Sequence, residues 1–253
     1  RKRAEMSERT GSGLALLIGA GDAIGAAVAQ RFAAGGYRIC IARRDAEKSR
    51  AIVDAIRTAG GIAEVVSVDA RSEESIQALF ARAEKELGAI EVCLFNAGAN
   101  VAAPLLETGA KLFTRAWELA CYGGFLTGRE AARYMVPRGR GTILFTGATA
   151  SLRGGAGFSA FAAAKSGLRG IAQAMARELA PKGIHVAHLI IDGAIDSEAI
   201  HKRLLAQGRD PAALPPDSLI QTCSVAQAYW SLHVQPRDGW THEMDIRPFA
   251  EKW

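Results

Sequence analysis

A glycine-rich turn near the beginning of the chain has the residue types that hold a phosphate group. Its three glycines are Gly19, Gly21 and Gly25, and Asp22, Ala23 and Ile24 lie between the last two of them. The first glycine permits a tight turn, small residues let the backbone approach a pyrophosphate, and N–H groups at a helix start bind the anion. We therefore expect a dinucleotide phosphate site here, although any tight strand-to-helix turn also uses glycine.

A turn of this kind needs a strand before it and a helix after it. Leu14 to Ile18 are apolar or small, which is the composition of a strand buried on both faces. The residues from 26 to 34 have helical composition, and the pair Gly35-Gly36 is a stop signal for that helix. The sequence therefore predicts strand, phosphate-binding turn and helix in that order.

The same alternation of strand and helix continues along the chain. Five more apolar stretches are predicted strands, at 37–42, 63–69, 90–96, 141–147 and 184–192. Helical segments are predicted between them, at 46–59, 72–87, 108–134 and 158–179, and a short last strand at 243–246. The pattern predicts an α/β fold, a Rossmann-type doubly wound parallel sheet in three layers (α/β/α) forming a single domain. In such a sheet, ligands bind at the carboxyl ends of the strands.

The composition is that of one globular domain. The chain has 253 residues, of which 49% are apolar and 23% charged. We expect a flexible tail at 1–11 and one domain over 12–253. Residues 1–9 supply +2 of the net charge of +5, and the other basic residues are scattered among acids. This scatter is typical of a solvated surface and argues against a nucleic-acid partner.

The sequence also favours a protein of the cytoplasm. No stretch approaches the roughly 20 apolar residues of a membrane span, and the tail, with Met6 as a candidate initiator, lacks the apolar segment of a secretory signal. The four cysteines show no CxxC spacing, which favours buried free thiols in a reducing compartment over disulfides. They are Cys40, Cys93, Cys121 and Cys223.

The residues at the predicted strand ends resemble those of the short-chain dehydrogenase/reductase family, from about Leu14 to Asp196. The family's first turn reads T-G-x-x-x-G-x-G, and here Ile18 replaces the threonine and Ala23 the middle glycine. The resemblance implies a nicotinamide dinucleotide cofactor and a set of residues that hold it. Beyond the glycine turn, these are Asp69 and Ala70 near adenine, Asn96-Ala97-Gly98, Lys165, Gly193, Ile195, and Ser197 in the place of a nicotinamide-binding threonine.

The end of the second strand indicates which dinucleotide is bound. An acidic residue there would bond the ribose 2′-OH and repel a 2′-phosphate. Here Arg43 and Arg44 follow Ala42 instead, and their guanidinium groups suit a phosphate. We therefore favour NADP(H) over NAD(H). The alternative is that both arginines merely project into solvent, and Asp22 is a mild objection, since it stands where some NADP-binding relatives place a basic residue.

The resemblance also implies a catalytic set of Asn, Ser, Tyr and Lys, and most of that set is replaced. The family places Tyr and Lys four residues apart on one helix face. Lys165 matches the lysine, but Phe161 stands at the tyrosine position. The serine position falls at Ala148, beside Thr149 as a substitute hydroxyl. Cys121 occupies the asparagine position.

These replacements separate cofactor binding from turnover. We expect binding to survive, whereas loss of a positioned general acid costs about 10²–10⁴ in rate. The first hypothesis is an oxidoreductase acting on a small-molecule carbonyl/alcohol pair, whose proton donor is Asp192, Thr149 or water. Asp192 stands where the family has proline, and it would need a raised pKa to donate. The second hypothesis is a catalytically silent NADP(H)-binding subunit with a regulatory or structural role.

The remaining expectations concern assembly, the lid and the histidines. Residues 197–222 replace the family's variable substrate lid. The helices at 108–136 and 158–179 are expected to build a homodimer or homotetramer. His188 is read as an interior histidine with its hydrogen bonds satisfied, and His185 and His201 as surface residues. No metal site and no membrane contact are expected.

Overall fold

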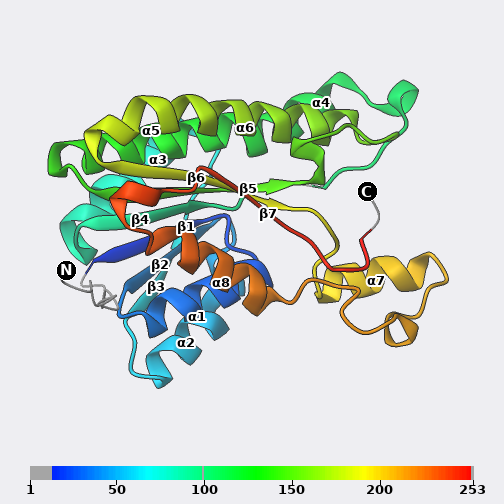
Figure 1. Cartoon of the computed structure of the whole chain (residues 1–253), viewed down its shortest axis with the longest axis horizontal. Helices are drawn as coiled ribbons and strands as arrows, with labels where there is room; N and C mark the ends of the chain where they lie inside the picture. Colours follow the sequence, from blue (N-terminus) through cyan, green and yellow to red (C-terminus); the bar gives the residue numbers. More distant parts are fainter. Residues whose placement is uncertain (1–12, 99, 252–253) are drawn as a thin grey trace.

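The computed structural model describes residues 13–98 and 100–251, so the predicted tail at 1–11 lies outside the described residues. A seven-stranded, wholly parallel sheet forms the middle layer, in the order β3-β2-β1-β4-β5-β6-β7 (Figure 1). The strands are β1 Leu14–Ile18, β2 Arg38–Arg43, β3 Ala63–Ser67, β4 Ile90–Phe95, β5 Gly141–Ala148, β6 Ile184–Ile191 and β7 Glu243–Ile246. The predicted fold class is confirmed.

Helices cover both faces of this sheet, as Figure 1 shows. One face packs against α1 Ile24–Ala34, α2 Arg50–Thr58 and α8 Thr222–His233. The other packs against α3 Glu73–Arg82, α5 Gly123–Met135 and α6 Ser159–Leu179, with α4 Ala110–Trp117 lying along α6. Each interface is an apolar layer, with Phe32 and Tyr229 buried in the first and Phe95 and Phe145 in the second. The remaining helix, α7 Glu198–Ala206, lies within the predicted lid, beyond the carboxyl ends of the strands.

The predicted long helix at 108–134 is interrupted. One turn of π-helix, Glu118–Tyr122, separates α4 from α5. Such turns add a residue to the helix and occur frequently at functional sites. The outer side of this helix pair carries Phe113, Trp117 and Phe125, each more than a third exposed. Self-association through these helices stays a prediction.

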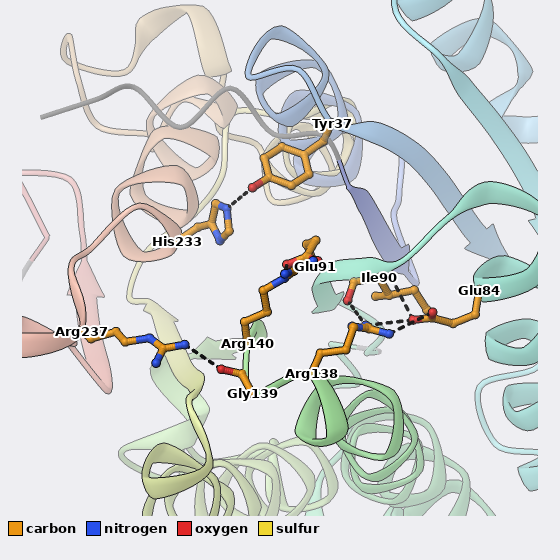
Figure 2. A network of polar contacts seen from close by, with 9 residues as sticks. All are labelled: Tyr37, Glu84, Ile90, Glu91, Arg138, Gly139, Arg140, His233 and Arg237. Atoms are coloured by element: carbon orange, nitrogen blue, oxygen red, sulfur yellow. Dashed lines mark hydrogen bonds and ion pairs between the residues drawn. The ribbon is translucent and has the colours of Figure 1, made fainter.

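Polar contacts join the elements at the amino ends of the strands, the edge away from the glycine turn (Figure 2). Arg138 donates to the Glu84 carboxylate at 3.0 Å and to the main-chain oxygen of Ile90 at 2.8 Å. On the other face, the Tyr37 hydroxyl lies 2.7 Å from Nε2 of His233. These contacts tie α5 to β4 and α8 to β2, and so fix the sheet against its helices.

Two predictions about single residues are corrected. His185 is buried rather than on the surface, because its ring stacks on Trp240 and its Nε2 lies 2.8 Å from the main-chain oxygen of Thr241. All four cysteines are free thiols, but Cys223 is exposed, at the start of α8, while the other three are buried. Within the described residues, the helices all lack the length or the apolar character needed to cross a bilayer.

Candidate active site

The glycine turn after β1 has the shape of a cradle for an anion. Gly19 has a φ of +74°, and a Cβ placed there would lie 2.5 Å from atoms of Ala97, so this position requires glycine. Gly21 is different, because a Cβ at this residue would meet no heavy atom within 4 Å and would project into open space. The first glycine therefore shapes the turn, and the second leaves room for a group as large as a pyrophosphate. The turn fits the predicted dinucleotide.

The first part of the cleft, where the sequence predicts the adenosine, lies between this turn and the end of β2. It is lined by Gly19, Gly21, Ala42, Arg43, Arg44, Lys48, Val68, Ala70, Ala97 and Gly98, among others. Arg43 donates to the Asp22 carboxylate at 2.6 Å and to the Ser49 hydroxyl at 3.2 Å. Arg44 and Lys48 lie along the same cleft. Three cations therefore lie where the sequence predicts a 2′-phosphate, and two of them have an acidic partner. Asp22 pairs with Arg43, and Asp45, which also lines the cleft, lies 3.5 Å from Lys48.

Asp69, predicted to contact adenine, is held by a neighbouring side chain. Arg71 donates through Nε at 3.0 Å and Nη2 at 2.7 Å, and its main-chain N–H also bonds the same carboxylate. These hydrogen bonds lower the pKa of Asp69 to about 2. The residues on either side, Val68 and Ala70, line the cleft. Asp69 is therefore a fixed anion between two residues that line this part of the cleft, and its partner Arg71 is a residue that the sequence did not single out.

A second part of the cleft, here called the reaction end, opens beyond the carboxyl ends of β4, β5 and β6. Its lining includes Asn96, Ala148, Thr149, Phe161, Lys165, Gly193 and Ile195. The ends of three strands, the start of α6 and the lid helix α7 thus bring most of the predicted site residues to one place. Ser197 is not among the lining residues, because its hydroxyl accepts the Ile200 N–H at 3.4 Å and so caps α7; Cys121 and Asp192 do not line this part either.

Lys165 and Phe161 occupy one face of α6 and both line the reaction end. The Lys165 ammonium donates to the main-chain oxygen of Thr146 at 2.8 Å and lies 6.0 Å from the centre of the Phe161 ring. Only 4% of this lysine is exposed, and burial lowers its pKa to about 8. The phenyl ring fills the place predicted for a tyrosine and has no proton to give.

A chain of hydrogen bonds that the sequence did not predict runs behind the reaction end. Thr146 donates to the side-chain oxygen of Asn96 at 2.8 Å, and Asn96 donates to the main-chain oxygen of Gly19 at 3.2 Å. The Tyr229 hydroxyl, fully buried on α8, lies 2.6 Å from the Thr146 hydroxyl. This chain fixes Asn96 against the glycine turn. Thr146 was detectable from its place at a strand end, whereas Tyr229 reaches the site only through the fold.

Asp192 lies under the reaction end as the centre of a small charged cluster. Its carboxylate, 1% exposed, accepts the Thr149 hydroxyl at 2.6 Å. Arg153 lies 3.5 Å and Arg247 3.7 Å from its oxygens. The two predicted substitute donors therefore touch each other, and the Thr149 proton is directed toward Asp192.

Cys121 belongs to the π-helical turn and faces α6 rather than the cleft. A Cβ added at Gly167 would lie 2.7 Å from its Sγ, so the sulfur packs directly on the α6 backbone. Burial raises the pKa of this thiol. Cys121 is a packing residue in this structure. It lies in a π-helical turn, an irregularity that is frequent at functional sites.

His188 lies on β6 below Lys165, fully buried. Its Nδ1 lies 3.0 Å from Glu243 on β7, and Arg169, one turn after Lys165 on α6, donates to the same carboxylate with two bonds of 2.7 Å. Nε2 has no partner among the described residues and lies against Gly147, so the ring is only half satisfied. Burial lowers the pKa of His188 to about 4, outweighing the opposing effect of Glu243.

This histidine should make the protein less stable in acid. The pKa of His188 is about 4 in the folded protein, and its ordinary value of 6.5 applies to the unfolded chain. Between these two pH values the unfolded chain therefore binds more protons. Above pH 6.5 the neutral His188 ring does not lower the free energy of unfolding. As the pH falls toward 4, the free energy of unfolding decreases by about 3 kcal/mol. Urea unfolding of the wild type and His188→Gln at pH 7 and 4.5 measures it. A pH effect of equal size in both proteins would contradict the assignment to His188.

Comparison with known proteins gives consistent similarities. The family model described as short chain dehydrogenase matches residues 13–207. The short-chain reductase protein NovJ of Streptomyces niveus is 35% identical over 173 residues, covering 68% of this chain and 66% of NovJ. The 3-oxoacyl-[acyl-carrier-protein] reductase of Bos taurus is 34% identical over 170 residues, covering 67% of this chain and 70% of that enzyme. The chain thus matches about two thirds of the length of these relatives.

A solved structure is similar over nearly the whole chain. The crystal structure of a short-chain dehydrogenase from Rhodopseudomonas palustris is 47% identical and superposes with a TM-score of 0.80. The match covers 93% of this chain and 98% of that protein. The similarity therefore includes the reaction end and the C-terminal segment, which lies beyond the region matched by the family model.

Proposed function

Because this chain belongs to the short-chain dehydrogenase/reductase family, we propose that it is an NADP(H)-dependent oxidoreductase acting on a small-molecule carbonyl/alcohol pair. The observation that carries this proposal is that the two parts of the cleft adjoin, because Gly98 lines both of them. Glycine cradle and cation cluster lie at one end and Lys165 at the other, so one extended dinucleotide can contact both.

Each part of the cleft has a part of the cofactor to hold. The glycine turn receives the pyrophosphate, and Arg43, Arg44 and Lys48 receive the 2′-phosphate. Lys165 binds the nicotinamide ribose. Asn96 lines the cleft beside it and is held by its hydrogen bond to the main-chain oxygen of Gly19. When bound, the reduced nicotinamide supplies the hydride. The remaining task for the chain is to orient the substrate and to deliver a proton without a tyrosine.

A silent NADP(H)-binding subunit is the second candidate, and one observation favours it. Three members of the family's catalytic set are replaced, and Cys121, at the position of the asparagine, is turned into α6. Calorimetry with NADPH and NADH, followed by NADPH oxidation with a panel of ketones and aldehydes, tests both candidates. Binding with turnover supports the oxidoreductase, and tight binding without turnover supports the silent subunit. Lack of affinity for either dinucleotide would reject both.

The pairing of Asp22 with Arg43 provides a test of cofactor preference. Asp22→Asn removes a carboxylate that repels a 2′-phosphate and releases Arg43 from its ion pair. Because Asp22 is 69% exposed, we expect a modest gain, about 2- to 5-fold tighter NADPH binding at low salt. NADH lacks the phosphate, so its affinity should stay unchanged.

Asp54→Asn is the matched control, since Asp54 is exposed on α2 and does not line the cleft. It makes the same change in net charge, and it should leave both dissociation constants as they are. An equal gain for NADH and NADPH in Asp22→Asn would mean that Arg43 does not read the 2′-phosphate.

We also propose that the protein is cytoplasmic. The support for this is the state of the cysteines, which are all free thiols. Free thiols persist in a reducing compartment. Labelling of whole cells with a thiol reagent that does not cross membranes should leave Cys223, the exposed cysteine, unmodified.

A further inference from the structure

The Lys165 ammonium is a buried charge at the reaction end, whose lining also contains the charged side chains of Arg203 and Glu251. Its hydrogen bond to Thr146 uses one of its three N–H donors, which leaves two for other groups. Burial is the sole cause of its lowered pKa, and no ion pair joins it to a carboxylate within residues 13–98 and 100–251. Lys165 therefore has two N–H donors that can bind a substrate and a proton that it can transfer to that substrate.

We propose that Lys165 is itself the general acid of the reaction and gives its proton directly to the substrate oxygen. This inference rests on the proposed function, because it names the missing proton donor. The carbonyl carbon receives a hydride, which oxidises the cofactor by two electrons, and the carbonyl oxygen receives the proton. Lys165 is left as a neutral amine and regains a proton from solvent after the product leaves. In the oxidative direction, the same amine accepts the alcohol proton.

The number of donors on Lys165 allows it to keep its structural role. One N–H remains on the Thr146 oxygen, one is available to the cofactor ribose, and the third is available to a group bound beside Phe161, whose ring centre lies 6.0 Å from Nζ. Because phenylalanine replaces tyrosine, no hydroxyl stands between the ammonium and a substrate bound over the Phe161 ring. The replacement that removes the usual donor therefore also opens the path from the lysine.

The other proton-bearing groups are engaged elsewhere. Thr149 donates to Asp192, and the Asp192 carboxylate lies 3.5 Å from Arg153 and 3.7 Å from Arg247. The Cys121 sulfur packs on Gly167. The ring of Tyr122 stacks on the outer side of the helix pair, between Trp117 and Phe125. Of the candidates, Lys165 combines a transferable proton with a place in the cleft lining.

The surroundings of Lys165 suit an acid that works near neutral pH. With a pKa of about 8 it is mostly protonated at pH 7 and still a far better donor than an ordinary lysine. His188 is the titratable group that faces it from β6, and with a pKa of about 4 it is neutral. Glu243 on β7 is occupied by Arg169 and His188. Asn96 and Thr146, from β4 and β5, carry no charge.

Lys165→Arg separates proton transfer from charge. Arginine keeps a cation and its hydrogen bonds but does not release a proton near neutral pH. We expect NADPH affinity within about 5-fold of wild type and carbonyl reduction slower by about 10²-fold or more. Thr149→Val and Asp192→Asn, which alter the competing donors, should each lower the rate by less than 10-fold. Reduction by Lys165→Arg at the wild-type rate would overturn the proposal.

Two further measurements guard against a variant that merely misfolds. Lys165→Ala should regain reductase activity with added methylammonium, and Lys165→Arg should not. In protein labelled with ¹³C at lysine Cε and free of cofactor, one lysine resonance should titrate near pH 8 and be absent from Lys165→Arg. Titration of every lysine above pH 10 would remove the acid. Wild type that binds NADPH but reduces no carbonyl would instead reject the proposed function.

Discussion

Phe161→Tyr combined with Ala148→Ser is expected to raise the rate of carbonyl reduction by about 10²-fold or more. Phe161 lines the reaction end on the same helix face as Lys165, whose ammonium lies 6.0 Å from the ring centre. A phenol added there would lie close to this cation, which lowers the pKa of the phenol and makes it an efficient acid. The serine at 148 adds a hydroxyl that can hold the substrate oxygen.

The backbone is already shaped for both side chains. Ala148 is extended at the end of β5, and its N–H donates to the buried Ser151 hydroxyl at 3.1 Å, so the loop after it is fixed. Stopped-flow or steady-state NADPH oxidation with a reactive aldehyde measures the gain. Phe158→Tyr is a matched control, because it adds the same hydroxyl at the start of α6 outside the lining of the reaction end.

The result would also bear on Lys165. If Lys165 is the present acid, the double variant should add a second, stronger donor and move the upper limb of the pH–rate profile. An unchanged rate with NADPH still bound would mean that the substrate does not lie over residue 161. In that case the reaction end, as defined by Phe161 and Lys165, would be misplaced.

The fold was predictable because its strands are uniform in character. Each central strand is a short apolar run, and glycines mark the neighbouring turns, so β1 and β7 were predicted at their observed limits. The π-helical turn between α4 and α5 was not predicted. Its residues, Glu118–Tyr122, have ordinary helical composition, and the turn that they form packs against α6.

The site was predictable where one residue acts through its position along the chain. Gly19 and Lys165 belong to local spacing patterns, and both line the cleft. Partnerships between distant residues were not predictable. Asp22 pairs with Arg43, which lies 21 residues away, and Tyr229 meets Thr146 across 83 residues. Only the sheet brings such pairs together.

Gly21→Leu is expected to abolish cofactor binding without harming the fold. A Cβ at this residue meets no heavy atom within 4 Å, so the protein has room for the side chain. The backbone there does not have a left-handed φ, so leucine introduces no strain. We expect the free energy of unfolding to stay within about 0.5 kcal/mol of wild type.

The same open space is where the pyrophosphate must approach the backbone. Leucine at this residue fills it and keeps the phosphate away from the N–H groups of the turn. We expect NADPH binding at least 100-fold weaker, a change of about 3 kcal/mol in binding free energy. Calorimetry measures the affinity, and urea unfolding measures the stability of the same preparation.

Gly239→Leu is the matched control, because a Cβ at Gly239 also meets nothing within 4 Å, yet this residue is not among those that line the cleft. It should change neither stability nor affinity. The comparison separates the two things that glycines do in this turn: shaping the chain, as at Gly19, and vacating space for a ligand. If Gly21→Leu bound NADPH as tightly as wild type, the space beside Gly21 would not hold the pyrophosphate, and the assignment of the whole cleft to a dinucleotide would fall with it.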